Sequence, residues 1–129
     1  MKLLLDTHIW IWTQLAAGKL SARVKRALDN EGSELWLSPI SVWELVLLVE
    51  KRRVALDRHV AEWVSQSTSA LKEAPLTLEI VLEAARFTLP HDDPADRFLV
   101  AKARTLGLTL VTSDARLLAS NAVPILPNR

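Results

Sequence analysis

Short apolar runs alternate with helix-forming segments along this chain. They lack the strict polar–apolar alternation of a half-exposed strand, so they are typical of strands buried on both faces of a parallel sheet. The pattern predicts an α/β fold: a three-layer α/β/α sandwich around a central parallel sheet of about four to five strands. The runs cover residues 2–5, 34–37, 76–77, 108–112 and 123–126.

The helices between these runs are marked by capping residues. Ser38-Pro39 and Asp93-Pro94 each place an N-cap residue before a proline at the first helical position. They predict helices over 39–53 and over 94–106, the second ended by Gly107. Other predicted helices cover residues 9–15, 22–30, 57–73, 78–88 and 115–119. No repeat or flexible linker interrupts the 129 residues, so one domain over 1–129 is expected.

Composition excludes several classes of protein and site. The absence of cysteine removes disulfides, thiolate metal sites and thiol catalysis, and it suits a reducing compartment. No apolar run approaches the roughly 18–20 residues of a membrane span, and the N-terminal run stops at Asp6, too early for a signal peptide. A cytoplasmic protein is expected. With a net charge of +1, nucleic-acid binding would depend on local basic patches, such as 23–26 or 51–53.

Two aspartates follow predicted strands at the edge of the sheet where ligands gather. Asp6 comes directly after the first strand, and Asp114 follows the strand over 108–112. Aspartate is also a common helix cap, and for either residue alone that explanation is at least as good. Two aspartates at the same edge favour a functional site.

Glu44 is more informative than either aspartate. Its helix is apolar nearly all round from Ile40 to Val49, so it is expected to be buried, and no basic residue lies one turn from Glu44. An ionised carboxylate in such a place is costly unless a cation or hydrogen-bond donors compensate it. A glutamate that reaches out to solvent is the structural alternative.

Asp96 completes the candidate cluster, in the first turn of the helix that Asp93 caps. Taken alone, its position is better explained by the helix dipole. The argument is collective: a parallel sheet can bring Asp6, Glu44, Asp96 and Asp114 together, and such a cluster calls for a divalent cation. All-oxygen ligands favour Mg²⁺ or Mn²⁺, which can activate water for attack on a phosphodiester.

Other kinds of site are weaker candidates. His8, His59 and His91 lack paired spacing and are expected to be surface or structural residues, with His8 facing the first helix. There is no glycine-rich phosphate loop and no serine in a nucleophile elbow. A phosphatase that uses Asp6 as nucleophile is an alternative, but dehalogenase-like phosphatases have a second aspartate where His8 stands. A protein-binding module without catalysis is another.

Four segments together resemble the PIN-domain family, in the subgroup related to VapC toxins, and they follow the family's order over nearly the whole chain. The segments are Asp6-Thr7-His8 with Trp12, then Ser41-Val42-Trp43-Glu44-Leu45, then residues 91–97 followed by 99–103, and finally Leu110-Val111-Thr112-Ser113-Asp114. The family often has an aromatic residue where Ala95 stands and glutamine where Lys102 stands. Neither departure touches the acids, although Lys102 is expected to alter substrate contacts.

The resemblance implies an endoribonuclease toxin with a Mg²⁺ or Mn²⁺ cofactor, an RNA substrate, an inhibitory antitoxin and a homodimer. It assigns metal binding and catalysis to Asp6, Glu44, Asp96 and Asp114. Asp93 becomes an auxiliary ligand, and Thr112 a hydroxyl that orients an acid. The basic residues Arg97, Lys51 and Arg52 are candidates for holding flanking phosphates, with a structural ion pair as the even alternative for Arg97. The five tryptophans are expected to serve the core or subunit contacts.

Overall fold

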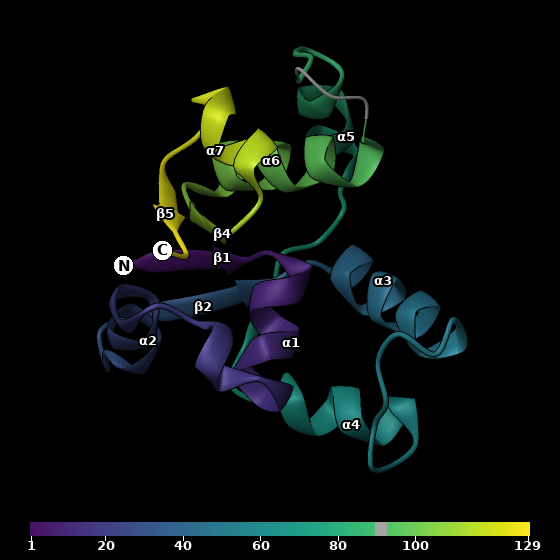
Figure 1. Cartoon of the computed structure of the whole chain (residues 1–129). Helices are drawn as coiled ribbons and strands as arrows, with labels where there is room; N and C mark the ends of the chain where they lie inside the picture. Colours follow the sequence, from purple (N-terminus) through teal and green to yellow (C-terminus); the bar gives the residue numbers. More distant parts are fainter. Residues whose placement is uncertain (90–92) are drawn as a thin grey trace.

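A wholly parallel five-stranded sheet forms the centre of the computed structural model, which describes residues 1–89 and 93–129 (Figure 1). The strand order is β3-β2-β1-β4-β5, so β1 is central, between β2 and β4. The carboxyl ends of these three strands therefore lie at one edge. The expected parallel sheet is confirmed. The strands are β1 (Lys2–Leu5), β2 (Glu34–Leu37), β3 (Lys72–Glu73), β4 (Thr109–Thr112) and β5 (Ile125–Pro127).

Helices cover both faces of the sheet, which confirms the three-layer architecture (Figure 1). On one side lie α1 (Thr7–Leu15), the short 3₁₀ helix η1 (Ala17–Lys19), α2 (Ala22–Asp29), α3 (Pro39–Glu50) and α4 (Val60–Ser67). On the other lie α5 (Leu78–Ala84), α6 (Pro94–Leu106) and α7 (Ala115–Ser120). None of the helices in the described ranges combines the length and the apolar character needed to cross a bilayer.

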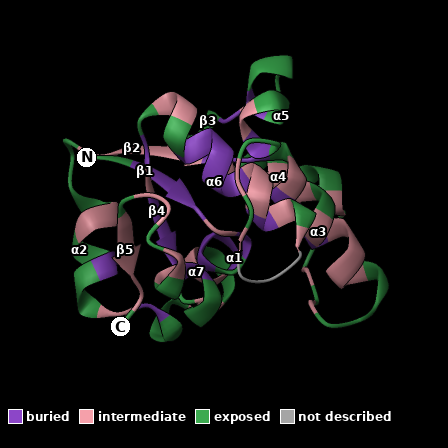
Figure 2. Ribbon diagram, turned by 90° about the horizontal axis from the view of Figure 1, so that it is seen from above, coloured by how far each residue is buried: buried purple, intermediate pink, exposed green. Residues whose placement is uncertain are grey.

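The core consists of two apolar layers separated by the sheet. Side chains alternate along a strand, so Leu3 and Leu5 of β1 point to one face and Leu4 to the other. Leu3 and Leu5 pack in a cluster with Trp10 of α1, whereas Leu4 packs in a cluster with Val100 of α6. Figure 2 shows β1, β4 and much of α6 as buried and most of α5 as exposed. Burial on both faces explains why residues 3–5 of β1 and 110–111 of β4 are all apolar.

The capping residues found in the sequence begin the helices as expected. The side chains of Ser38 and Asp93 each accept a hydrogen bond from a backbone N–H in the first turn of their helix. Ser21 and Thr77 cap α2 and α5 in the same way. Gly107 ends α6 with φ of 67°, a left-handed conformation that glycine adopts without steric cost. The caps at Asp93 and Ser38 fix the starts of α6 and α3, the helices that carry the candidate acids Asp96 and Glu44.

Several element boundaries differ from the sequence-based expectation. The third strand is Lys72–Glu73 rather than 76–77, because Trp36 and Leu37 of β2 pair with these two exposed residues. An exposed edge strand of two charged residues carries no apolar signal. Helix α4 begins at Val60 rather than Asp57, since His59 is its cap, and it ends at Ser67 rather than at residue 73. Helices α3 and α5 end earlier, at Glu50 and Ala84.

Lys102 is fully buried, so the expectation that it would alter substrate contacts is wrong. It lies on α6 with a relative exposure of 0%, and its ammonium donates a hydrogen bond of 2.5 Å to Ser38 Oγ. Burial lowers the pKa of Lys102 to about 8, with the charge of Glu73 acting in the opposite direction. The folded protein therefore holds the Lys102 proton less tightly than the unfolded chain does.

This buried amine makes stability depend on pH in the alkaline range. The unfolded chain keeps the Lys102 proton up to its ordinary pKa, whereas the folded chain releases it above about 8. The unfolded state thus binds more protons, and the free energy of unfolding should rise between pH 8 and 10, by about 2 kcal/mol. Urea unfolding across this range measures the rise. The Lys102→Met variant should lack this component, and an identical pH dependence in the two proteins would contradict it.

Candidate active site

Five acidic side chains line one pocket of about 400 Å³, from elements that end or begin at the carboxyl edge of the sheet. We call it the acidic pocket. The predicted acids Asp6, Glu44, Asp96 and Asp114 all line it, together with Asp93. The remaining lining residues are Thr7, His8, Trp12, Ser113 and Arg116. The expectation that four distant segments bring their acids to one place agrees with this geometry.

Asp6 lies between β1 and α1 and has both carboxylate oxygens hydrogen-bonded. Its Oδ1 accepts from the backbone N–H of Thr7 at 2.8 Å, and its Oδ2 accepts from the Thr112 hydroxyl at 2.6 Å. Burial raises the pKa of Asp6; these two hydrogen bonds and the nearby His8 oppose the rise, and the charge of Asp114 adds to it. A nearby cation would favour the ionised form of this carboxyl group.

The hydroxyl of Thr112, the last residue of β4, joins two of the acids. It donates to Asp6 and accepts from the backbone N–H of Asp114 at 3.0 Å, and Thr112 is fully buried. One side chain thus fixes the orientation of Asp6 and the path of the chain into Asp114. This hydrogen bond agrees with the orienting role that the family resemblance implies for Thr112.

Glu44 reaches the pocket from the middle of α3. Its Oε1 lies 2.8 Å from the Thr7 hydroxyl, which also lies 2.8 Å from Ser41 Oγ. A hydroxyl has one proton, so the Thr7 hydroxyl can donate to the Glu44 carboxylate while it accepts a hydrogen bond from the Ser41 hydroxyl. Burial raises the pKa of Glu44, against the hydrogen bond from Thr7, and the negative charges of Asp6, Asp93 and Asp96 add to the rise.

The expected burial of α3 on nearly all sides is wrong. Glu44 is half-buried, and Trp43 beside it is 59% exposed. Only Ser41 and Leu45 of this helix are buried. The apolar composition of α3 therefore does not mean that Glu44 is fully buried. Of the tryptophans, Trp10 and Trp63 belong to the core as expected.

Two acids project from the first turn of α6. Asp93 is the N-cap, with Oδ1 accepting from the backbone N–H of Ala95 at 3.0 Å. Asp96 is buried, with 7% of its surface exposed. The positive end of the helix dipole favours negative charge at both positions. Capping and pocket lining are therefore not exclusive explanations, because Asp93 does both.

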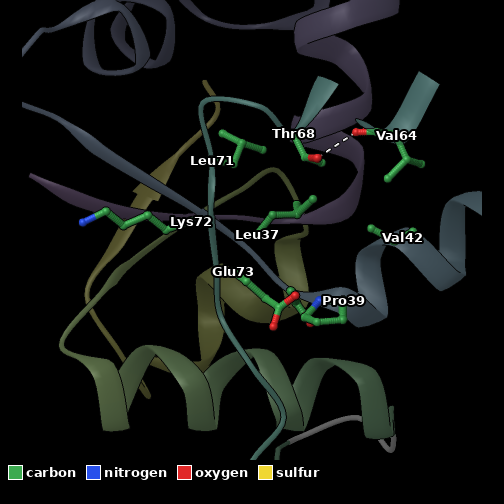
Figure 3. A pocket seen from close by; sticks show the side chains of 9 residues that line it. Leu37, Pro39, Val42, Val64, Thr68, Leu71, Lys72 and Glu73 are labelled. Carbon is green, nitrogen blue, oxygen red and sulfur yellow. Dashed lines mark hydrogen bonds between the residues drawn. The ribbon is translucent and has the colours of Figure 1, made fainter. Parts of the chain in front are cut away.

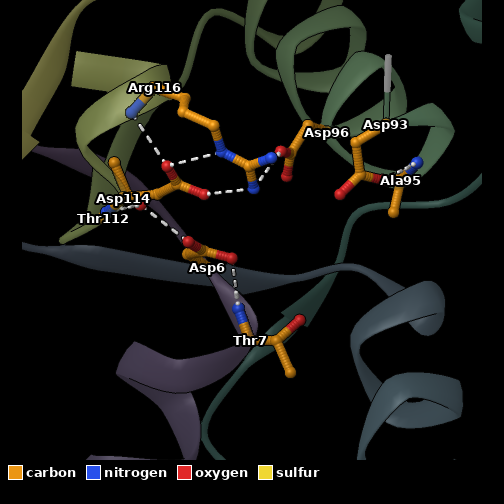
Figure 4. Close-up of polar contacts among 8 residues, drawn as sticks. All are labelled: Asp6, Thr7, Asp93, Ala95, Asp96, Thr112, Asp114 and Arg116. Atoms are coloured by element: carbon orange, nitrogen blue, oxygen red, sulfur yellow. Dashed lines mark hydrogen bonds and ion pairs between the residues drawn. The ribbon is translucent and has the colours of Figure 1, made fainter. Parts of the chain in front are cut away.

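Arg116 is the member of the pocket that the sequence analysis did not predict. Figure 4 shows its guanidinium between Asp114 and Asp96. Its Nη2 lies 3.0 Å from Asp114 Oδ2 and 3.8 Å from Asp96 Oδ2. Asp114, the N-cap of α7, holds the pKa of this guanidinium above its ordinary value. The available signal was a basic residue two positions after a candidate acid.

The pocket fits a divalent cation by its chemistry, although its side chains do not surround one point. Carboxylate and hydroxyl oxygens are the ligands that Mg²⁺ and Mn²⁺ prefer. Burial in the pocket raises the pKa values of Asp6 and Glu44, and the neighbouring negative charges add to the rise. Among the residues that the structure describes, no three His, Asp or Glu side chains are arranged to hold an ion as they stand. The expectation that the four carboxylates meet at a single point is therefore wrong; they share a pocket, and two of them are held by Arg116.

The basic residues proposed for phosphate binding lie elsewhere. The Arg97 guanidinium donates to the backbone carbonyls of Ala84 at 2.9 Å and Phe87 at 3.0 Å, so it ties α6 to α5 and the surrounding loop. This geometry supports a structural role for Arg97, with backbone carbonyls in place of the expected ion-pair partner. Lys51 and Arg52 are exposed at the end of α3 and do not line the acidic pocket.

One of the described histidines lies at the acidic pocket and the other lies away from it. His8 lies on α1, is exposed and lines the acidic pocket, with its ring 5.8 Å from that of Trp12. This is a correction, because His8 was not expected at the site. His59 caps α4 and is structural, as expected. His91, and with it Asp92 of the third motif, lies outside the described residues.

A second hollow, of about 470 Å³, lies beside β2 and β3 (Figure 3). Its lining is mostly apolar, including Leu37, Val42 and Leu71, and none of the four candidate acids reaches it. Figure 3 shows Lys72 and Glu73 pointing in opposite directions there. This hollow is larger than the acidic pocket, but it lacks the cluster of carboxylates found there.

Comparisons with known proteins agree with this architecture. A family model described as "PIN domain" matches residues 3–122. Ribonuclease VapC22 of Mycobacterium tuberculosis is 33% identical to this chain over 117 residues, which cover 88% of each protein.

Two solved structures share the fold at low identity. A VapBC2 structure from Rickettsia felis, bound to a DNA fragment from its promoter, superposes with a TM-score of 0.75, 15% identity and 98% coverage of both chains. A DNA-bound VapBC structure from Salmonella typhimurium gives a TM-score of 0.73, 20% identity and coverage of 100% of this chain and 99% of the other.

Proposed function

This chain belongs to the PIN-domain family, and from that premise we propose that it is a divalent-metal-dependent endoribonuclease, the toxin of a toxin–antitoxin pair. The observation that carries the proposal is the acidic pocket, where four acids from four segments of the chain lie together. The 33% identity to a protein named as a ribonuclease supports RNA as the substrate.

Asp6, Glu44, Asp96 and Asp114 would hold the metal, with Mg²⁺ or Mn²⁺ as the proposed ion and Asp93 as an auxiliary ligand. When bound, such an ion lowers the pKa of a coordinated water and offsets negative charge on a phosphodiester. The chain's own contribution is orientation. Thr112 holds Asp6, and Thr7 holds Glu44, so the two carboxylates enter the pocket with fixed directions.

An antitoxin and a second copy of the chain are the proposed protein partners. Structures of related fold are described as VapBC complexes, which supports an antitoxin for this chain. Exposed apolar side chains are available for such contacts, among them Trp43 on α3 and Leu78 and Leu82 on α5. Lys51 and Arg52 stay candidates for phosphates farther along the RNA.

The phosphatase alternative is disfavoured by the surroundings of Asp6. Dehalogenase-like phosphatases have a second aspartate two positions after the nucleophile, and His8 stands at that position here, in the first turn of α1. Purified protein should therefore be incubated with RNA and with p-nitrophenyl phosphate, each with Mn²⁺ and with EDTA. The proposal predicts that RNA is cleaved in Mn²⁺ but not in EDTA, and that nitrophenol is released in neither. Nitrophenol release without RNA cleavage would favour the phosphatase, and no turnover of either would favour a binding module.

Thr112→Val should lower the rate of RNA cleavage by about 10- to 100-fold, the range seen when a group that orients a metal ligand is removed. Valine keeps the shape of threonine but cannot donate to Asp6 or accept from the Asp114 N–H. Thr112→Ser restores the hydroxyl and should recover most of the rate. Single-turnover cleavage measures both variants, and equal rates for valine and wild type would contradict the orienting role.

A further inference from the structure

Arg116 bridges two elements of the acidic pocket through its guanidinium. It contacts Asp114, which follows β4, at 3.0 Å and approaches Asp96, in the first turn of α6, at 3.8 Å (Figure 4). Its side chain is 55% exposed, so it reaches the carboxylates from the solvent side of the pocket. Within the described lining, it is one guanidinium among five carboxylates.

The same two carboxylates are half of the proposed metal-binding set. A guanidinium and a metal ion that both need Asp96 and Asp114 oppose each other, since each is a cation and the oxygens cannot serve both fully. Ion pairs as exposed as these are weak and easily released, whereas direct coordination by a divalent ion brings twice the charge. The arrangement also explains why the carboxylates do not surround one point here.

We propose that Arg116 competes with the divalent cation for Asp96 and Asp114 and thereby sets the metal concentration at which the site fills. The inference rests on the proposed function, because it needs a metal in this pocket. Arg116 is a positioning residue in this account: it holds two carboxylates in place when no ion binds them, and it withdraws toward solvent when one does.

The capping role of Asp114 can be separated from this competition. The Asp114 side chain caps α7 by accepting a hydrogen bond from the backbone N–H of Arg116 at 2.9 Å. This hydrogen bond does not depend on the Arg116 side chain. Arg116→Met therefore removes the charge and leaves the cap. Arg104→Met is a matched control, because Arg104 is 44% exposed and pairs with Glu83 at 3.3 Å, outside the pocket.

Direct binding of Mn²⁺ to the purified proteins, followed by electron paramagnetic resonance of the free ion, tests the competition. Arg116→Met should bind Mn²⁺ about 3- to 10-fold more tightly than wild type, as expected for the loss of two weak competing ion pairs. Arg116→Lys, which keeps the charge without the planar fork, should lie between them. Arg104→Met should match wild type. Equal or weaker binding by Arg116→Met would overturn the inference.

Thermal unfolding gives a second readout that needs no turnover. In EDTA, Arg116→Met should melt below wild type because Asp96 and Asp114 lose the ion pairs with this guanidinium, and added Mn²⁺ should raise its Tm more than that of wild type. Equal increments would overturn the inference. If wild type binds Mn²⁺ and cuts RNA but Arg116→Met binds Mn²⁺ no better, only the inference fails. If neither protein binds Mn²⁺ and wild type cuts no RNA, the proposed function fails with it.

Discussion

Replacing Glu44 with glutamine is expected to slow RNA cleavage at least about 100-fold without unfolding the protein, the scale of loss when one charged group at a reacting centre is removed. Glutamine has the same shape and can still accept from the Thr7 hydroxyl, so the packing of α3 against α1 should persist. It lacks the negative charge that the proposed metal needs. Single-turnover cleavage of RNA in Mn²⁺ measures the loss.

Glu50→Gln is the matched control for this variant. Glu50 is the last residue of the same helix, is exposed and does not line the acidic pocket. It makes the same chemical change outside the site and should cleave RNA at the wild-type rate. Equal losses in both variants, or full activity in Glu44→Gln, would contradict the role of Glu44.

Replacing Asp6 with asparagine should have opposite effects on activity and on stability. Cleavage is expected to fall at least about 100-fold, for the reason given for Glu44. In EDTA the free energy of unfolding should rise, because burial and, to a lesser extent, the charge of Asp114 disfavour the charged form of Asp6. Asparagine can accept from the Thr7 N–H, and its amide can donate to Thr112 Oγ1.

Urea unfolding in EDTA and single-turnover cleavage in Mn²⁺ measure the two effects of Asp6→Asn on one preparation. Asp29→Asn, at the exposed end of α2, is the control and should change neither. A variant that is both inactive and less stable than wild type would mean that Asp6 serves the fold rather than a metal site.

The sequence could place the four aspartates of the acidic pocket because each is tied to a local signal. Asp6 and Asp114 follow apolar strands, and the parallel sheet brings the ends of β1 and β4 to one edge. Asp93 is a cap before a proline, which fixes the first turn of α6 and with it Asp96. Such signals depend on the backbone, and the backbone of a parallel α/β sheet follows from the order of its elements.

What the sequence did not predict depends on side-chain contacts between distant segments. Lys102 was expected to alter substrate contacts, yet it is buried and donates to Ser38, the cap of α3. Arg97 reads as a candidate for phosphate binding, but backbone carbonyls near α5 hold it. Arg116 follows Asp114 by two positions, and only the approach of α6 shows that it also meets Asp96. No pattern of spacing reports these partners.

Titration of the wild-type protein with Mn²⁺, beside Asp6→Asn and Glu44→Gln, tests most directly whether these carboxylates form a metal site. The account predicts that wild type binds Mn²⁺ and that each variant binds at least about 10-fold more weakly, because each removes a charged oxygen ligand. Two results would contradict the account: Mn²⁺ binding with the same affinity in wild type and both variants, or RNA cleavage by a wild-type protein that binds no Mn²⁺. Either result would show that the acids of this pocket do not hold a catalytic metal.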